Sequence, residues 1–284
     1  MSGQRNRARR RSEFSQHFLR GKSLAARLVT DTSISRDDFV IEIGPGQGAL
    51  TQELAARCGR LIAIEIDREL YRRLSVEFQD AGHVNLINDD FLRFPLPTEP
   101  YKVFANIPYN QTAKIVRKLV GSVVPPQQAY LILQQEAAEK FAGAPYVAES
   151  LFSLLLKPWW HVEILRRLRQ TDFTPPPKVH SVLIWMAKRT APLIDPSEYP
   201  LYNDFLTATF AQGGQTIRHI LRPVFTERQI VRFARDLRFD SRASPSTLSF
   251  DQWLVLFRYT SLDENLALRR KYIGLGKDYA FPKN

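Results

Sequence analysis

The chain has 284 residues, an apolar fraction of 44% and a formal net charge of +11. This length predicts one large domain with a smaller one, and the positive charge indicates a polyanionic partner such as a nucleic acid. The sequence has no run of 18 apolar residues and no apolar stretch behind its basic N-terminus, which argues against a membrane span and a secretory signal. A single cysteine, Cys58, excludes an intramolecular disulfide and favours a cytoplasmic location, and the scattered histidines indicate no metal site.

The first dozen residues form a basic segment without a hydrophobic pattern. Arginine occupies five of its positions, namely Arg5, Arg7, Arg9, Arg10 and Arg11. We predict that residues 1–12 form a disordered arm that binds RNA phosphates, with Arg9, Arg10 and Arg11 among the contacts. A tail that only keeps the chain soluble is the alternative.

A glycine-rich turn follows the first predicted strand of the main domain. Residues 39–43 are a short apolar run, the turn is Gly44-Pro45-Gly46-Gln47-Gly48, and residues 49–54 have a helical composition. Strand, glycine turn and helix form the first unit of a Rossmann-like sheet, where the backbone approaches a ligand closely and the helix N-terminus favours an anionic group. The G-x-G-x-G spacing differs from the G-x-G-x-x-G of pyrophosphate cofactors.

Acidic residues end the next two predicted strands. The run 61–66 contains Glu65, 21 positions after Gly44, where a carboxylate can bind ribose hydroxyls. The run 84–88 is followed by Asp89 and Asp90, and Asp90 is a candidate acceptor for an adenine amino group. A helix cap or a turn is the alternative for both aspartates.

The most informative turn follows the strand predicted at 101–106. It reads Asn106-Ile107-Pro108-Tyr109 and combines an amide acceptor, a rigid proline and an aromatic ring. Asn106 can accept a hydrogen bond from an exocyclic N–H, Pro108 biases Ile107 to an extended shape that presents its carbonyl, and Tyr109 can stack on a ring. Such a turn can hold a flipped-out base, and the alternative is an ordinary strand-ending turn with a surface tyrosine.

The chain resembles the rRNA adenine N6-methyltransferase family, which groups the erythromycin-resistance (Erm) methylases with the KsgA-type dimethyltransferases. The resemblance covers nearly all of residues 13–258. Its motifs stand at Ser15–Leu19, Glu42–Gly48, Ile64–Asp67, Asp90, Asn106–Tyr109 and Phe173–Ser181. His17 departs from the usual Gln-Asn-Phe-Leu of the first motif.

The resemblance implies transfer of a methyl group from S-adenosylmethionine to N6 of an adenine in RNA. The residues implied in cofactor binding are His17, Leu19, Gly44, Gly46, Gly48, Glu65, Ile66, Asp90, Phe91 and Asn106. The residues implied at the target base are Asn106, Ile107, Pro108, Tyr109 and Phe173, with Phe173 holding the ring from the side opposite Tyr109.

The C-terminal part bears on the branch of the family. KsgA-type enzymes usually carry an Arg-Arg-Lys cluster after Phe-x-Gln, whereas Gly213 and Gly214 follow it here, and residues 248–257 resemble the Erm ending. This favours a 23S rRNA methyltransferase that confers macrolide-class resistance. The alternatives are a KsgA-type 16S rRNA dimethyltransferase, a non-catalytic RNA-binding or transcription-assisting protein on the same scaffold and, more weakly, a DNA adenine methylase.

The predicted fold class is α/β, with a Rossmann-like class I methyltransferase sheet and a smaller all-helical C-terminal domain. Strands are expected at 39–43, 61–66, 84–88, 101–106, 129–134, 161–166 and 180–187, with the last two antiparallel at one edge as the resemblance suggests. We expect the S-adenosylmethionine-binding domain over 13–190 and an RNA-binding helical domain over 191–261. Residues 262–284 carry no assignable pattern.

Further basic residues are candidates for RNA contact outside the arm. We expect contacts from Lys114, Arg117, Arg166, Arg218 and Arg222. Arg228, Arg232 and Arg235 share one helix face, with few acids nearby, although a solvated face is the common reading of such a pattern. The expected partner is rRNA, protein-free or in an assembling large subunit, with a single-stranded or flipped adenine, and the expected state is a monomer.

Overall fold

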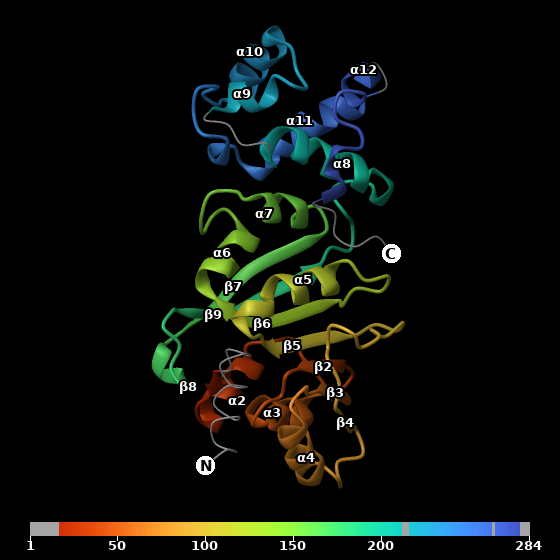
Figure 1. The fold of residues 1–284 in the computed structure, drawn as a ribbon, viewed down its shortest axis with the longest axis vertical. Helices are drawn as coiled ribbons and strands as arrows, with labels where there is room; N and C mark the ends of the chain where they lie inside the picture. The colour runs from red at the N-terminus through yellow and green to blue at the C-terminus, as the bar shows by residue number, and fades with distance from the viewer. Residues whose placement is uncertain (1–16, 212–215, 263–264, 279–284) are drawn as a thin grey trace, which may run out of the picture. The chain divides into compact units, whose positions relative to one another are not determined.

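The computed structural model describes residues 17–211, 216–262 and 265–278, and its fold is drawn in Figure 1. The described chain divides into two compact units. The sheet unit holds residues 17–138 and 162–188, and the helical unit holds residues 139–161 and 189–278. The predicted arm at 1–12 and the Gly213-Gly214 segment lie outside the described residues.

A seven-stranded sheet forms the centre of the sheet unit, in the order β4-β3-β2-β5-β6-β9-β7. The strands are β2 (Phe39–Ile43), β3 (Arg60–Ile64), β4 (Val84–Ile87), β5 (Lys102–Asn106), β6 (Gln128–Gln134), β7 (Trp160–Leu168) and β9 (Ser181–Lys188). Pairing is parallel from β4 to β6, and β9 runs antiparallel to β6. The predicted α/β class is confirmed, and each expected strand is present within two residues of its expected ends.

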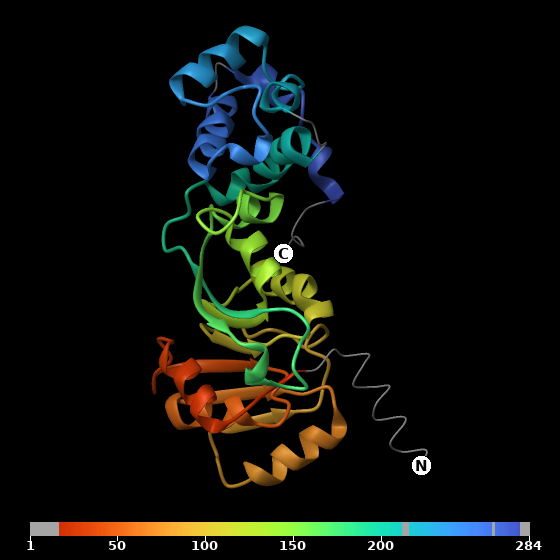
Figure 2. The ribbon, with the colours of Figure 1, turned by 90° about the vertical axis from the view of Figure 1, so that its left-hand side faces the viewer.

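Helices cover both faces of this sheet. The connections contain α2 (Lys22–Thr30), α3 (Ala49–Arg57), α4 (Arg68–Glu77) and α5 (Thr112–Val120). The chain moves from β2 to β3 in one direction and from β5 to β6 in the other, so right-handed crossovers place α3 and α5 on opposite faces (Figure 2). Leu28 of α2 and Leu54 of α3 share one buried cluster with Phe104 of β5.

A two-stranded antiparallel sheet joins distant parts of the sheet unit. It consists of β1 (Phe18–Leu19) and β8 (Phe173–Thr174), with Phe18 opposite Thr174 and Leu19 opposite Phe173. Strands of two residues have no periodicity that a sequence pattern could reveal. This pairing brings the N-terminal motif and the Phe173 motif side by side.

The helical unit is built around aromatic side chains. Its helices are α7 (Leu151–Leu156), α8 (Tyr199–Leu206), a π-helix at Thr207–Ala211, α9 (Ile217–Leu221), α10 (Glu227–Asp236), α11 (Phe250–Ser261) and α12 (Leu266–Arg269), and α6 (Gln135–Ala142) spans the boundary between the units. The helical unit also has short 3-10 turns at Pro196–Glu198, Pro245–Thr247 and Leu275–Asp278, and the sheet unit has two more at Tyr109–Gln111 and Gln170–Asp172. The Phe205 ring contacts Phe225, Trp253, Phe257 and Tyr272.

Residues 265–278, for which the sequence predicted no structure, fold against α8. Asp204 of α8 accepts hydrogen bonds from the backbone N–H groups of Gly274 and Gly276, at 2.6 and 2.7 Å. Tyr272 is fully buried, and its hydroxyl lies 2.6 Å from that of Thr260. This segment is therefore part of the helical unit.

Across the described residues, no helix is long and apolar enough to cross a membrane.

Candidate active site

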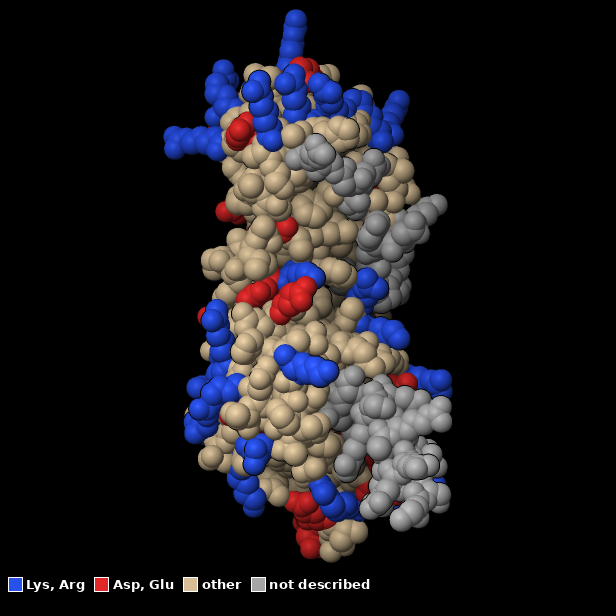
Figure 3. All heavy atoms as spheres, turned by 60° about the vertical axis from the view of Figure 1, so that its left-hand side comes forward, with Lys and Arg blue, Asp and Glu red and all other residues tan. Residues whose placement is uncertain are grey.

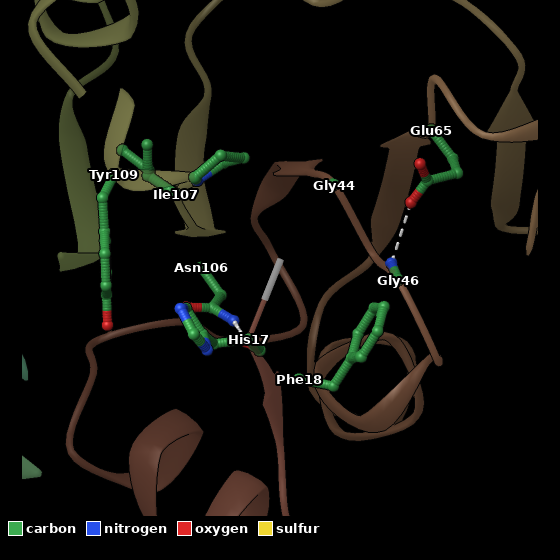
Figure 4. A pocket seen from close by; sticks show the side chains of 9 residues that line it. His17, Phe18, Gly44, Gly46, Glu65, Asn106, Ile107 and Tyr109 are labelled. Carbon is green, nitrogen blue, oxygen red and sulfur yellow. Dashed lines mark hydrogen bonds between the residues drawn. The ribbon is translucent and has the colours of Figure 1, made fainter. Parts of the chain in front are cut away.

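The candidate site lies where the strand order reverses. β2 and β5 are neighbours, but the chain leaves β2 toward β3 and leaves β5 toward β6. In open α/β sheets such a switch point, at the carboxyl ends of the strands, is where ligands bind. A pocket at this point is lined by His17, Phe18, Gly44, Gly46, Glu65, Asn106, Ile107, Pro108 and Tyr109 (Figure 4).

The glycine loop after β2 adopts a conformation that requires glycine. Gly44, Gly46 and Gly48 have φ values of 67°, 60° and 86°. A side chain at Gly46 would also meet the Phe18 ring at 2.9 Å, so Phe18 packs directly on the loop. Gly48 is the N-cap of α3, which directs unpaired backbone N–H groups toward the loop. The loop therefore presents backbone rather than side chains to the pocket.

Glu65 reaches the glycine loop from the end of β3. Its Oε2 accepts a hydrogen bond from Gly46 N at 2.9 Å, and its Oε1 accepts one from Asp67 N at 2.8 Å. The side chain is buried, and desolvation raises the pKa of its carboxyl. Each carboxylate oxygen has a second lone pair, so this group can accept from the hydroxyls of a ribose. These acceptor oxygens therefore fit the hydroxyls of the ribose in a nucleoside cofactor.

Glu42 is a second buried acid, and in the sequence it stands out only as the first residue of the Glu42–Gly48 motif. It lies in β2, two residues before Gly44, and only 1% of its surface is exposed. No described residue meets full hydrogen-bond geometry with either carboxylate oxygen, although the nearby Thr51 hydroxyl partly offsets the effect of burial on the pKa. Burial raises the pKa of Glu42 to about 8, so the group is protonated at neutral pH. An acid inside an apolar strand run was the signal that could have identified it.

The Asn106 amide has a defined orientation. Its Nδ2 donates a hydrogen bond to the main-chain carbonyl of His17 at 2.7 Å, so Oδ1 is the end left to accept a bond (Figure 4). Ile107 N donates to the carbonyl of Ile132 at 3.0 Å, which continues the β5–β6 pairing into the turn. The turn is thus held by backbone on both sides, and Asn106 lines the pocket with its Oδ1 outside the bond to His17.

Tyr109 is fixed at the opposite side of the turn. Its hydroxyl lies 2.6 Å from that of Ser181, the first residue of β9. Burial raises the pKa of this phenol, so the ring stays neutral. The hydrogen bond anchors the end of the ring to β9, so the ring is available as a wall for a planar ligand.

Several predicted site residues lie outside the pocket lining. Phe173 is buried with 1% exposure in the cluster of α2 and α3, because its pairing with Leu19 turns it to the core. Phe173 is not part of the pocket lining, and its role as a second ring against the base, which the resemblance implied, stays a prediction. Asp90 Oδ1 accepts a hydrogen bond from Leu92 N at 2.9 Å. This is the geometry of a turn, which was the alternative to binding an adenine amino group. Leu19 and Phe91 are packing residues, and Ile66 is 45% exposed.

The predicted RNA contacts are distributed over both units. Lys114 and Arg117 are exposed on α5 and line an open groove with Phe94 and Val123. Arg166 pairs with Asp31 at 2.6 Å, which reduces the charge it can offer to RNA. Arg9, Arg10 and Arg11 lie outside the described residues.

Within the part of the chain that the structure describes, no group of three or more side chains could hold a metal ion.

Arginines gather over α9 and α10 in the helical unit (Figure 3). The residues of this basic surface are Arg218, Arg222, Arg228, Arg232, Arg235, Arg238 and Arg242. Glu227 pairs with Arg218 at 2.5 Å and with Arg222 at 3.5 Å, and Asp236 pairs with Arg235 at 2.9 Å. Together with Asp240, three acids among seven arginines leave a net positive surface, as expected for a polyanionic partner.

Comparisons with known proteins agree with this geometry. The family model described as ribosomal RNA adenine dimethylase matches residues 7–261. The ribosomal RNA small subunit methyltransferase A of Synechococcus sp. (strain JA-3-3Ab) is 32% identical over 87% of this chain and 91% of its own length. The rRNA adenine N-6-methyltransferase of Aeromicrobium erythreum is 31% identical over 91% of this chain and 76% of its own length. The crystal structure of the 23S rRNA methyltransferase ErmE, 27% identical, superposes with a TM-score of 0.79 over 86% of this chain and all of that chain.

Proposed function

The chain belongs to the ribosomal RNA adenine dimethylase family, and we propose that it transfers a methyl group from S-adenosylmethionine to N6 of an adenine in 23S rRNA. Such a modification would confer macrolide-class antibiotic resistance. The observation that carries the proposal is the Asn106–Tyr109 turn, which shares one pocket with the glycine loop and Glu65. We further propose that the protein acts as a cytoplasmic monomer.

The residues of the turn supply hydrogen bonds to the nucleobase. The lone pair of adenine N6 is delocalised into the ring, so this nitrogen is a poor nucleophile. Asn106 Oδ1 and the Ile107 carbonyl would accept hydrogen bonds from the N6–H groups and draw electron density back onto nitrogen. The Tyr109 ring would stack on the base and align it. The proton can leave after the methyl group arrives, so no strong general base is needed.

Alignment is the main contribution expected from the protein. S-adenosylmethionine would supply the reactive sulfonium methyl, and Glu65 with the glycine loop would hold its nucleoside part. Well-oriented reactants gain roughly 7–11 kcal/mol over free ones, mostly because their translational and rotational entropy is already spent on binding. The backbone anchors of Asn106 and Ile107 give the rigidity that such alignment requires.

The choice of 23S rRNA is supported by the TM-score of 0.79 to ErmE. A second candidate is methylation of 16S rRNA during small-subunit assembly, which the 32% identity to a small-subunit methyltransferase favours. The two candidates share the same pocket chemistry, so the substrate decides between them. The glycine pair that favours the Erm branch lies outside the described residues.

A labelling experiment separates the candidates. The purified protein is incubated with methyl-labelled S-adenosylmethionine and, in separate reactions, with protein-free large-subunit or small-subunit rRNA. We expect label in the large rRNA alone. Label confined to the small rRNA, or to assembling small-subunit particles, would replace the 23S proposal by the 16S one. Label in neither RNA, with cofactor still bound, would support the non-catalytic alternative.

Deleting residues 1–11 tests the basic arm. The deletion removes five arginines. A plot of log affinity against log salt concentration has a negative slope, and its magnitude should decrease by about 0.7–0.9 for each phosphate that the arm no longer neutralises. We therefore expect weaker rRNA binding and a flatter salt dependence, measured by filter binding between low and high salt. An unchanged slope would show that the arm does not bind phosphates, and replacing the five arginines with lysine should preserve the slope.

A further inference from the structure

His17 makes three contacts that connect the two sides of the pocket. Its Nδ1 lies 2.7 Å from the carbonyl oxygen of Pro175, and its own carbonyl accepts the bond from Asn106 Nδ2. Its ring centroid is 5.4 Å from that of Tyr109, with 30° between the planes. Figure 4 shows the ring beside Asn106, on the side that faces Tyr109. All four residues belong to the sheet unit.

The bond to Pro175 determines which ring nitrogen of His17 carries a hydrogen. A carbonyl oxygen can only accept, so Nδ1 must carry the hydrogen. This bond fixes the ring orientation as well as the tautomer. It also extends the β1–β8 pairing, which by itself covers only two residues on each strand. Two-stranded pairs of this kind are marginal in isolation, so an added side-chain bond contributes to their order.

The backbone of His17 in turn orients Asn106. The amide of asparagine can present either its NH₂ group or its oxygen to a ligand, and the His17 carbonyl engages the NH₂ group. If this carbonyl shifted, the amide could rotate and present a donor to the target amino group. A displacement of about 1 Å in such a site can lower a rate about 100-fold.

We propose that His17 is a positioning residue for the target adenine, an inference that rests on the proposed methyl transfer. Its side chain holds residue 17 against Pro175, its carbonyl sets the Asn106 amide, and its ring supports Tyr109. This role lies on the base side of the pocket and differs from the cofactor contact that the resemblance implies for the N-terminal motif. His17 acts through Asn106 and Tyr109 rather than on the reacting atoms.

Substitutions at His17 test this role by single-turnover methyl transfer at saturating cofactor and RNA. We expect His17→Ala to lower the rate about 10-fold, with cofactor affinity within about 3-fold of the original protein. His17→Asn, which keeps an N–H donor for the Pro175 carbonyl, should recover the rate to within about 3-fold. His17→Phe keeps a ring but has no donor, so its rate should stay about 10-fold low.

His83→Ala is the matched control. His83 Nε2 lies 2.8 Å from the carbonyl of Ala55, so the substitution removes the same kind of bond away from the pocket lining. We expect it to leave the transfer rate unchanged. An undiminished rate in His17→Ala, or equal reductions of rate and cofactor affinity with no rescue by His17→Asn, would overturn the proposal.

A second measurement does not depend on activity. The ¹⁵N resonances of the His17 ring should show hydrogen on Nδ1, and hydrogen on Nε2 alone would contradict the bond to Pro175. Failure of the original protein to methylate either rRNA would contradict the proposed function itself. Normal methylation by both the original protein and His17→Ala would contradict only the role of His17.

Discussion

Replacing Asn106 with alanine is expected to lower methyl transfer at least about 100-fold, because removing one positioned hydrogen bond to a developing transition state costs about 10²–10³ in rate. The bond removed is the one that Oδ1 would accept from the target amino group. The substitution leaves the Gly46–Glu65 contact in place, so cofactor affinity should be nearly unchanged. Single-turnover transfer and equilibrium cofactor binding measure the two quantities separately.

Two variants sharpen this test. Asn106→Asp keeps an oxygen toward the pocket but replaces the donor that faces the His17 carbonyl with a second oxygen, so it should also be strongly impaired. Asn85→Ala removes an exposed amide from β4 and should transfer normally. Normal transfer by Asn106→Ala would show that the base is held elsewhere, and normal transfer by Asn106→Asp would show that the bond to His17 is dispensable.

Glu42→Gln is expected to change the dependence of stability on pH. Burial raises the pKa of Glu42 from 4.5 to about 8, so the folded protein holds a proton that the unfolded chain releases between these values. The stability contributed by the protonated group is complete below pH 4.5 and is lost as pH rises through about 8. The difference between 4.5 and about 8, at 1.4 kcal/mol for each pKa unit, corresponds to a loss of roughly 5 kcal/mol.

Thermal unfolding between pH 5 and pH 9 measures this effect. The Tm of the original protein should fall across this range, by about 2–4 °C for each kcal/mol. Glu42→Gln cannot ionise, so its Tm should fall less and should exceed that of the original protein at pH 9. Glu77→Gln, at an exposed position on α4, is the control and should follow the original profile. Parallel profiles for Glu42→Gln and the original protein would show that Glu42 is ionised when folded or is reached by water.

Short-range sequence patterns predicted most of the sheet and part of the site. Each strand of the main sheet is a short apolar run, and its period and flanking turn residues are local properties. The carboxyl ends of parallel strands meet at one edge, so Gly44, Glu65 and Asn106 could be expected together before any coordinates were known. The pocket lining includes all three.

The same patterns predicted less about positions that depend on contacts between distant segments. No local pattern predicted that Phe173 pairs with Leu19 in the β1–β8 sheet and lies in a buried cluster. Asp90 met both a ligand-binding and a turn-capping pattern, and its hydrogen bond to Leu92 N is local. Residues 265–278 have no clear period, yet the carboxylate of Asp204 in α8 holds their backbone.

The sequence by itself determined the α/β class, the order of the strands along the chain and the residue types that surround the pocket, because these follow from local composition and spacing. The tertiary structure alone decided which end of the Asn106 amide faces the pocket and which ring supports Tyr109. Both depend on His17, whose bond to Pro175 joins residues 158 positions apart. Contacts at that separation leave no periodic signal in the sequence, and they form only when the whole sheet unit has folded.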